Sequence, residues 1–456
     1  MTLLLTIYKE RWRVRSFYLQ ARFSHKARAG SAVEGGNLNQ QKQDQQVIGG
    51  VRCALGPQET THASVHIRGN RIRRILTSLA GSSDAQSDGE YIDLSGFLLL
   101  PGLVNAHDHL EFALFPRLGS PPYRNYVEWG EDIHCRFPDT IAKHRAVPKD
   151  LRLWWGGIRN LLCGVTTVSH HNPLWPELQR EDFPVRVVRE YGWGHSLALG
   201  GDLRQARAAT PEGLPFIVHA CEGVDEQARA ELRGLERLGL LDQDAVLVHG
   251  LAIDREGVAL MRDRRASLIV CPSSNNFLFG RLPDLSLLSG VEQIALGNDS
   301  PLTAEGDLLD EIRFAMRCCG VSPSRAYQMV TAVPASILRL SDAEGSIRES
   351  GFADVIAVRG TGGSPAERLE TMSMADVEFV MIGGRVQLVS ALLMERLPFA
   401  QTQGLEPLSI DGTTRWLRAP VSALLEKTEA VLGKGEVRLG SRRVLIPAGV
   451  EAEHAF

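Results

Sequence analysis

The chain has 456 residues, 44% of them hydrophobic, and a formal net charge of −4. A chain of this length and composition can bury a large core, which excludes a disordered protein and favours a globular one. The charge offers no basic field for nucleic acid or an anionic membrane, and no apolar run approaches the roughly 20 residues that cross a bilayer, so we expect a small-molecule partner.

Residues 1–46 begin with the apolar run Thr2–Leu5, which precedes a basic segment rather than following one. This order is the reverse of a secretory signal, so we predict an N-terminal extension. An organellar transit peptide and a translation start assigned too far upstream remain alternatives. The seven cysteines form no CxxC pair and are odd in number, which argues against a disulfide framework and favours a reducing, cytoplasmic location.

Two strand-rich blocks, residues 47–100 and 341–395, flank the middle of the chain. The first contains a predicted hairpin around the turn Gly69-Asn70, and the second contains one around Gly383-Gly384. Because neither block looks self-sufficient, we expect the two to join into one composite β-sandwich.

Residues 101–340 alternate short apolar runs with helical stretches, the pattern of repeated βα units around a parallel sheet. The predicted strands are Leu103–Ala106, Gly164–Ser169, Val185–Val188, Leu197–Leu199, Phe216–Val218, Ala245–Val248, Ser267–Val270 and Gln293–Leu296. This pattern predicts an α/β protein with a TIM-like (β/α)8 barrel, in which the third and fourth units are reduced. Residues 396–456, with a helical pattern over Val421–Leu432, are predicted to be a C-terminal extension.

The stretch "PGLVNAHDHLEF" places two histidines at the end of the first predicted barrel strand. Successive side chains of a strand point to opposite faces, so His107 and His109 should point the same way and Asp108 the other way. Three further apolar runs end at comparable side chains: Val218 precedes His219, Val248 precedes His249, and Asn298 precedes Asp299. The carboxyl ends of barrel strands meet at one mouth, so these side chains are expected to converge.

Three imidazoles and one carboxylate, from His107, His109, His219 and Asp299, suit one Zn²⁺ ion, or Fe²⁺, with a position left for water. Such an ion lowers the pKa of bound water towards about 7, so the set predicts hydrolysis by metal-bound hydroxide. The barrel should hold a single metal, because the chain has no lysine between Lys149 and Lys427 that could be carbamylated to bridge two ions.

Two further residues are candidates for proton transfer and orientation. Glu222 follows His219 by three residues and could protonate a leaving group; the alternative is an ordinary glutamate in the first turn of a helix. His249 could hold the attacking water or polarise the substrate, and its alternative is a satisfied core histidine. His170 and His171 also end a strand, and we interpret them as structural because the metal shell is already complete.

In order along the chain, "LLLPGLVNAHDHL", "GVTTV", "FIVHACEG", "VLVHG", "CPSSN", "ALGNDS" and "EGSIRESGFADVIAVR" resemble the amidohydrolase superfamily. The resemblance covers residues 47–390 and is closest to the branch of cytosine, adenosylhomocysteine and triazine deaminases and chlorohydrolases. It implies that Asp299 takes the proton of the water while Glu222 passes one to a ring nitrogen. It also implies that His249 steadies the water and the tetrahedral oxygen, and that Ser274 and Asn275 contact the substrate.

The chain departs from this family between the metal-binding strands. Asp108 stands where threonine is common, and the loop over residues 114–133 is unlike that of the methylthioadenosine deaminases, so the resemblance does not supply a substrate. The pocket could be lined by four side chains of this loop, which could equally serve packing alone: Arg117, Tyr123, Tyr126 and Trp129.

The leading hypothesis is hydrolytic deamination of an amino-substituted heterocycle, with Glu222 assisting the departure of ammonia. The alternative is cleavage of a cyclic amide, or of another C–N or C–halogen bond, by the same chemistry. A non-catalytic barrel scaffold is less favoured, because a scaffold needs no four convergent metal-binding groups beside an acid. Whether the chain forms a homo-oligomer stays open.

Overall fold

The computed structural model describes residues 45–77, 89–199, 201–360 and 362–447. The chain divides into residues 1–43 and 44–456, and all described residues belong to the second part. The predicted extension over residues 1–46 therefore lies outside the described residues, except for Gln45 and Gln46, which open the first strand.

Eight parallel strands form two sheets in the described middle of the chain, a three-stranded sheet in the order β6-β7-β8 and a five-stranded sheet in the order β13-β12-β11-β10-β9. Their bounds are β6 (Leu103–Asp108), β7 (Val165–His170), β8 (Arg186–Val187), β9 (Gly192–Gly194), β10 (Phe216–Ala220), β11 (Ala245–His249), β12 (Ser267–Val270) and β13 (Ile294–Leu296). The two sheets meet where the backbone N–H of Asp299, just after β13, donates to the carbonyl oxygen of His107 in β6 at 3.1 Å. The fold is α/β, as predicted.

The prediction of a strand at Leu197–Leu199 is wrong, because these residues form a turn and the strand lies at Gly192–Gly194. The two glycines allow close packing: a Cβ at Gly192 would lie 1.7 Å from Thr210 Oγ1, and one at Gly194 would lie 2.3 Å from Leu203 Cδ2. Glycine is depleted in strands, so a prediction based on apolar runs does not detect the glycine-rich strand β9.

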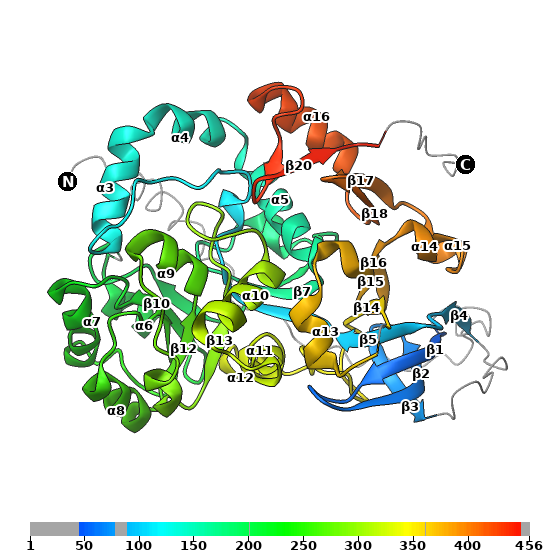
Figure 1. Cartoon of the computed structure of the whole chain (residues 1–456), viewed down its shortest axis with the longest axis horizontal. Helices are drawn as coiled ribbons and strands as arrows, with labels where there is room; N and C mark the ends of the chain where they lie inside the picture. The colour runs from blue at the N-terminus through cyan, green and yellow to red at the C-terminus, as the bar shows by residue number, and fades with distance from the viewer. Residues whose placement is uncertain (1–44, 78–88, 200, 361, 448–456) are drawn as a thin grey trace, which may run out of the picture. The chain divides into compact units, whose positions relative to one another are not determined.

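Helices connect most of the parallel strands and lie around them (Figure 1). Their bounds are α3 (Tyr126–Arg136), α4 (Pro138–Arg145), α5 (Lys149–Leu162), α6 (Leu203–Ala208), α7 (Glu226–Arg237), α8 (Arg255–Arg264), α9 (Pro272–Phe279), α10 (Leu308–Cys319), α11 (Pro323–Met329) and α12 (Ala332–Ile337). Four of these helices begin where an aspartate side chain accepts a hydrogen bond from the first turn, at Asp202, Asp225, Asp254 and Asp307. Within the described ranges, no helix is both long enough and apolar enough to span a membrane.

Both faces of the parallel strands are buried. On one face Val104, Ile217, Val246 and Ala295 belong to a single apolar cluster. Phe216, the neighbour of Ile217, points the other way and packs in the larger core with side chains of the helices. Burial on both faces explains why these strands read as continuous apolar runs rather than as alternating ones.

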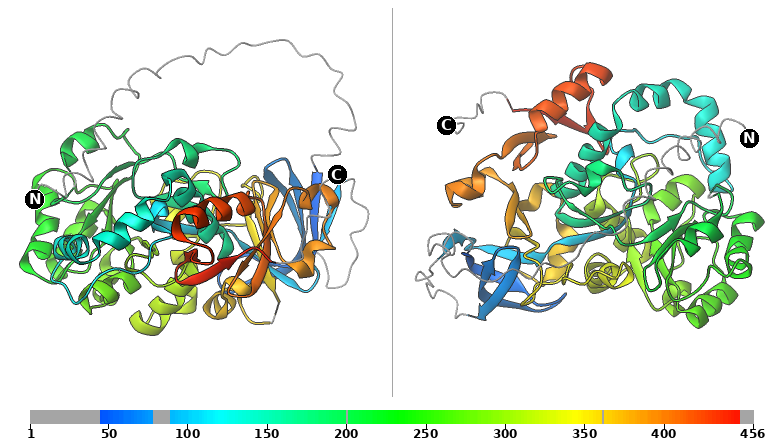
Figure 2. Two further views of the ribbon diagram at one scale, coloured as in Figure 1. Left: turned by 90° about the horizontal axis from the view of Figure 1, so that it is seen from above. Right: turned by 180° about the vertical axis from the view of Figure 1, so that it is seen from behind.

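The two flanking blocks join into one sheet, which has twelve strands within the described ranges, in the order β19-β20-β17-β18-β16-β15-β14-β5-β1-β2-β3 with β4 beside β1. The bounds are β1 (Gln45–Ala54), β2 (Thr60–Arg68), β3 (Arg71–Thr77), β4 (Glu90–Asp93), β5 (Phe97–Pro101), β14 (Val355–Arg359), β15 (Val377–Ile382), β16 (Arg385–Val389), β17 (Glu406–Ile410), β18 (Thr413–Leu417), β19 (Arg438–Leu439) and β20 (Arg442–Leu445). Antiparallel pairing of β5 with β14 connects the N-terminal strands to the C-terminal ones, and Figure 2 shows the blue and orange strands side by side. Both predicted hairpins are confirmed, as β2 with β3 and as β15 with β16.

Strands of the C-terminal region continue this sheet, since β18 pairs with β16. The remaining helices are α13 (Pro365–Thr371), α14 (Ala391–Met394), α15 (Phe399–Thr402) and α16 (Val421–Leu432). Helix α16 has the predicted bounds and lies beside α5 (Figure 1), where Trp155 Nε1 donates to Thr428 Oγ1 at 2.9 Å.

Candidate active site

Three histidines converge at the ends of β6 and β10. The ligating nitrogen atoms of His107, His109 and His219 all lie within 4.8 Å of one another, and the Nε2 atoms of His107 and His219 are 3.3 Å apart. Strand β6 holds one extra residue between Asn105 and Asp108 relative to β7, a β-bulge beside the site. Asp108 points away from the cluster, as predicted, and accepts from Asn160 Nδ2 of α5 at 2.7 Å.

The imidazoles of this cluster are suited to binding a cation. Burial, followed by neighbouring imidazoles, holds the pKa of His107 and of His219 well below the usual range, so both rings are neutral. His219 Nδ1 lies 2.8 Å from the carbonyl oxygen of His195 and donates its proton there, which leaves the Nε2 lone pair facing His107. Three imidazoles and one carboxylate are a ligand set that fits a divalent transition metal.

The carboxylate is that of Asp299, which follows β13. Its Oδ1 atom lies 3.5 Å from His109 Nε2 and 3.8 Å from His107 Nε2. The other oxygen, Oδ2, accepts hydrogen bonds from Ser274 Oγ at 2.8 Å and from Thr303 Oγ1 at 3.1 Å. Burial opposes ionisation, but the surrounding imidazoles and Ser274 lower the pKa of Asp299 to about 2, so the group is a carboxylate at neutral pH.

Glu222 and His249 face each other at the same mouth, with Glu222 Oε1 3.6 Å from His249 Nε2. Burial, then the charges of Asp299 and Glu231, raise the pKa of Glu222 well above its usual range, so this carboxyl keeps its proton. Burial lowers the pKa of His249 to about 4, so its ring is neutral. One protonated acid and one ionised carboxylate therefore lie in one site, the division of labour that acid–base catalysis requires.

Local backbone strain marks the positions from which these groups project. Cys221, His249 and Asp299 have φ angles of 56°, 76° and 52°, in the left-handed region that residues other than glycine rarely adopt. Glu222 is not on a helix, because α7 begins only at Glu226. Strain of this kind concentrates at functional sites, where the surrounding structure must hold it in place.

Comparisons with known proteins agree with this geometry. The amidohydrolase family model matches residues 194–387. A 5-methylthioadenosine/S-adenosylhomocysteine deaminase of Thermococcus sibiricus is 22% identical over 358 residues, which cover 65% of this chain and 81% of that protein. Over residues 194–387 the chain is similar to the amidohydrolase family, and its deaminase relatives support a hydrolytic enzyme that acts on C–N bonds.

Solved structures of low sequence identity share the fold. An atrazine chlorohydrolase from Arthrobacter aurescens, complexed with zinc, aligns with a TM-score of 0.64 at 16% identity and covers 85% of this chain and 100% of its own. An adenosine deaminase from Xanthomonas campestris with bound zinc aligns with a TM-score of 0.58 at 18% identity, covering 85% of this chain and 97% of its own.

Ser274 and Asn275 of α9 contact Asp299 and His249 directly. Ser274 bonds Asp299, and Asn275 Nδ2 lies 3.2 Å from His249 Nδ1. An amide nitrogen can only donate, so His249 Nδ1 accepts and Nε2 carries the proton that faces Glu222. The Oδ1 atom of Asn275 is buried without a hydrogen-bond partner among the described residues, and substrate contact by this residue stays a prediction.

Arg117 and Trp129 are engaged in packing the loop that precedes and opens α3. Arg117 lies over the ring of Phe277 at 4.8 Å, and its Nη2 atom is 3.8 Å from Glu305 Oε1. Trp129 Nε1 donates to the carbonyl oxygen of Leu118 at 2.9 Å. Within the described ranges neither residue forms a hydrogen bond or an ion pair with the histidine cluster, so their contact with a substrate also stays a prediction.

Two further histidines, His171 and His195, lie against the histidine cluster. The rings of His171 and His219 have centroids 4.1 Å apart, and those of His195 and His219 are 4.8 Å apart. His195 directly follows β9, so the rule applied to the other strand ends would have selected it if that strand had been placed correctly. His171, which the sequence predicts to be structural, lies beside His107 and His219 and forms part of the site wall.

A second ring of polar groups surrounds His109. Asn172 Nδ2 lies 3.2 Å from His109 Nδ1 and donates to Glu111 Oε1 at 2.8 Å. Glu111 Oε2 in turn lies 3.5 Å from His170 Nε2, so His170 acts behind the cluster rather than in it. No motif in the sequence distinguishes Asn172 from an ordinary loop asparagine.

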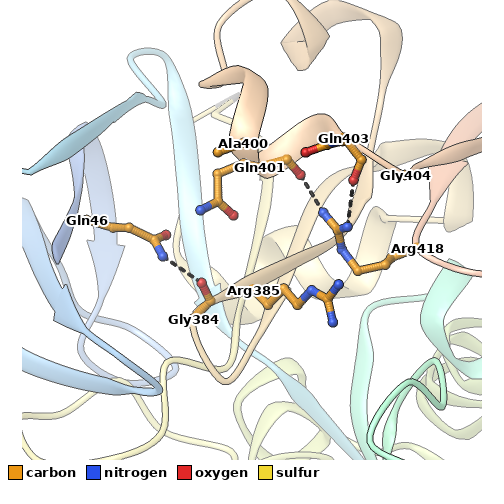
Figure 3. Close-up of a pocket in the computed structure, with 8 residues that line it drawn as sticks. All are labelled: Gln46, Gly384, Arg385, Ala400, Gln401, Gln403, Gly404 and Arg418. Carbon is orange, nitrogen blue, oxygen red and sulfur yellow. Dashed lines mark hydrogen bonds between the residues drawn. The ribbon is translucent and has the colours of Figure 1, made fainter. Parts of the chain in front are cut away.

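A separate polar pocket lies on the flanking sheet (Figure 3). It has a volume of about 500 Å³ and is lined by Gln46, Gly384, Arg385, Ala400, Gln401, Gln403, Gly404 and Arg418. Gln46 Nε2 donates to the carbonyl oxygen of Gly384, and Arg418 donates to the carbonyl oxygens of Gln401 and Gln403. None of these lining residues belongs to the histidine cluster.

Proposed function

We propose that this protein is a metal-dependent deaminase of an amino-substituted heterocycle. The observation that carries the proposal is geometric: Asp299 lies beside three converging histidines, and a second buried acid, Glu222, faces His249 at the same mouth, where burial raises its pKa. Removal of an amino group from a ring needs both an acceptor for the proton of water and a donor for the ring or leaving group.

His107, His109, His219 and Asp299 would hold the metal, with Zn²⁺ favoured over Fe²⁺ because three imidazoles and a carboxylate suit its preferences. A divalent ion bound there supplies a water that is acidic enough to act as a nucleophile at neutral pH. The zinc in the two solved relatives supports this choice.

The chain's own residues then supply the proton transfers. Asp299 accepts a proton of the attacking water through the oxygen that faces the histidines, while Ser274 and Thr303 hold its other oxygen. Glu222 delivers its proton to a ring nitrogen, and Asp299 passes the proton taken from water to the amino group, which departs as ammonia. Glu222 regains a proton from the new hydroxyl group as the carbonyl forms. His249, oriented by Asn275, points its Nε2 proton towards the reacting oxygen and stabilises the charge that develops there.

The names of the relatives favour deamination, but they also leave hydrolysis of a C–halogen bond or a cyclic amide as an alternative. The curated relatives include 5-methylthioadenosine/S-adenosylhomocysteine deaminases, whereas one structural relative is an atrazine chlorohydrolase. Hydrolysis of a C–halogen bond or a cyclic amide uses the same water and the same carboxylate, and differs in the group that leaves.

The discriminating experiment measures ammonia release over a panel of amino-substituted purines, pyrimidines and triazines, with chloride release from chlorotriazines measured in parallel. Deamination predicts ammonia in proportion to product. Turnover with chloride release and no ammonia would establish the alternative, and no turnover of any panel member by metal-loaded protein would favour a scaffold.

We further propose that residues 101–340 form a closed (β/α)8 barrel and that residues 47–100 and 341–395 form a composite β-sandwich. The contact between the ends of β13 and β6 supports closure, and the pairing of β5 with β14 supports the composite. Residues before Gln45 would be an N-terminal extension, whereas the strands of residues 396–456 would belong to the composite sheet, because β18 pairs with β16 and β17 pairs with β18. The protein would act in the cytoplasm on a small molecule.

A further inference from the structure

The turn that carries Glu222 requires support from outside itself. Cys221, the residue before Glu222, is buried and has a φ angle of 56°, a conformation that costs a non-glycine residue of order 1 kcal/mol or more. The next residues, 222–225, precede α7 without forming a helix. The direction in which Glu222 projects therefore depends on whatever fixes the backbone at Cys221.

Glu231 of α7 provides that support from behind the turn. Its Oε2 atom accepts a hydrogen bond from the backbone N–H of Cys221 at 2.7 Å. The side chain of Glu231 is 5% exposed, although glutamate is rarely buried without a partner. A buried carboxyl group that accepts the backbone N–H of Cys221 compensates for the strained backbone that presents it.

Tyr126 connects the carboxyl group of Glu231 to the segment that follows β10 and carries Glu222. Its hydroxyl donates to Glu231 Oε1 at 2.8 Å and accepts from the backbone N–H of Ala198 at 3.3 Å. The backbone N–H of Tyr126 donates to the carbonyl oxygen of Glu222 at 3.3 Å. Tyr126 thus contacts both Glu222 and Glu231, the residue that supports the backbone before Glu222.

The start of α3 is held against this turn by two further contacts. Asn125, the N-cap of α3, donates from Nδ2 to Asp225 Oδ2 at 2.6 Å. The backbone N–H of Val224 donates to the carbonyl oxygen of Arg124 at 2.7 Å. Gly223 is required at this crossing, because a Cβ there would lie 2.6 Å from the carbonyl oxygen of Arg124.

We propose that Glu231 and Tyr126 are positioning residues that fix the backbone of Cys221 and Glu222, so that the carboxyl of Glu222 is held at the reacting atoms. The proposal rests on the proposed function only for what Glu222 does in the reaction. The positioning itself is a property of the fold and can be measured without a substrate.

The test compares Glu231→Ala, Glu231→Gln and Tyr126→Phe with the control Glu226→Ala, which removes an exposed glutamate from the same helix. The first measurement is amide hydrogen exchange in peptides that cover residues 219–224. We expect at least tenfold faster exchange in Glu231→Ala, an intermediate rate in Tyr126→Phe, and near wild-type protection in Glu231→Gln, because the amide oxygen still accepts from Cys221. Unchanged exchange in Glu231→Ala would overturn the proposal.

The second measurement is the metal content of the same variants, followed by kcat and KM on whichever substrate the panel identifies. We expect unchanged metal content, a fall in kcat of tenfold or more in Glu231→Ala with KM changed less than about threefold, and rescue by Glu231→Gln. Loss of metal together with activity would show a general structural role and contradict positioning. If Glu231→Ala does not fold, Tyr126→Phe decides alone. Faster amide exchange over residues 219–224 with metal retained would support the proposal, and no change in exchange or metal content would overturn it. If the panel yields no substrate, the exchange result still decides the proposal while the proposed function fails.

Discussion

The protonated state of Glu222 gives the clearest prediction for a single residue. Burial and the charges of Asp299 and Glu231 keep the proton on this carboxyl, whose oxygen lies 3.6 Å from His249. Glu222→Gln preserves shape and burial but cannot transfer a proton, so turnover should fall by roughly 10²–10⁴-fold while metal content is unchanged. Assays of ammonia release and metal content check both parts, with Glu226→Gln as the control. Full activity in Glu222→Gln would remove this residue from the mechanism.

Gly297 tests how closely β13 must approach the metal cluster. A Cβ at this position would lie 2.5 Å from His107 Cβ and 2.9 Å from the His107 backbone nitrogen, neither of which can move freely. Gly297→Ala should therefore destabilise the protein by about 1–3 kcal/mol and lower its metal occupancy. Urea unfolding and metal analysis measure these effects. Gly130→Ala, in α3 with no atom within 4 Å of the added Cβ, should neither destabilise the protein nor lower its metal occupancy, because alanine favours a helix over glycine. Equal destabilisation of the two variants would refute the steric explanation.

At the scale of residues, the sequence predicts the site residues that directly follow apolar strands. It does not predict the residues that support them through tertiary contacts. His107, His109 and His219 are brought together as the strand-end rule predicted. His195 was missed because its strand contains two glycines and was placed a few residues too late. Glu231 carries no local signal at all, since its position on α7 resembles that of any amphipathic helix until the tertiary contact with Cys221 is known.

At the scale of elements, the contact between α9 and α10 gives a prediction on pH. Burial raises the pKa of Glu311 in α10 to about 7, and its carboxyl accepts from the backbone N–H of Ser273 at the start of α9. The folded protein therefore retains this proton up to about pH 7, whereas the unfolded chain releases it near 4.5. The stability that this group contributes is present below about pH 4.5 and is lost as the pH rises through about 7.

Glu311→Gln cannot titrate, so its free energy of unfolding relative to the wild type should increase between pH 5 and pH 8. Urea unfolding at both pH values measures the difference. Glu305→Gln, at an exposed side chain, is the matched control and should show no such trend. A difference between Glu311→Gln and wild type that stays constant with pH would contradict the raised pKa.

Long helices and very short strands also differ in how reliably the sequence predicts their bounds. The twelve residues of α16 were predicted with correct bounds, because its apolar residues recur along one face. The short strands β8 and β9 have two and three residues, too few for any periodicity to be visible, and their place follows from pairing with longer neighbours.

At the scale of the whole molecule, the C-terminal region is attached to the segment that carries Asp299. Arg442 of β20 forms ion pairs with Asp307 and Asp310 at the start of α10. Gly440 lies against the backbone of Gly306, where a Cβ would be 3.0 Å from the carbonyl oxygen. This attachment is not predictable from the sequence, because a contact between residues more than 130 positions apart leaves no local pattern.

Arg442→Ala should destabilise the protein by up to about 3 kcal/mol, because it leaves two carboxylates close together without their cation. Asp307 is nearly fully buried, so the loss should exceed that of an ordinary surface ion pair. Thermal unfolding compares this variant with Arg438→Ala, which removes an exposed arginine from the adjacent strand. Equal melting temperatures for the two variants would show that the attachment contributes nothing to stability.

The measurement that tests the central claim most directly is the metal content per chain of protein purified without chelators, with both zinc and iron available. A His107→Ala/His109→Ala variant prepared in the same way is the comparison. The convergence of three imidazoles and Asp299 predicts about one metal ion per wild-type chain and none in the variant. Wild-type protein that folds but binds no metal under these conditions would contradict the account.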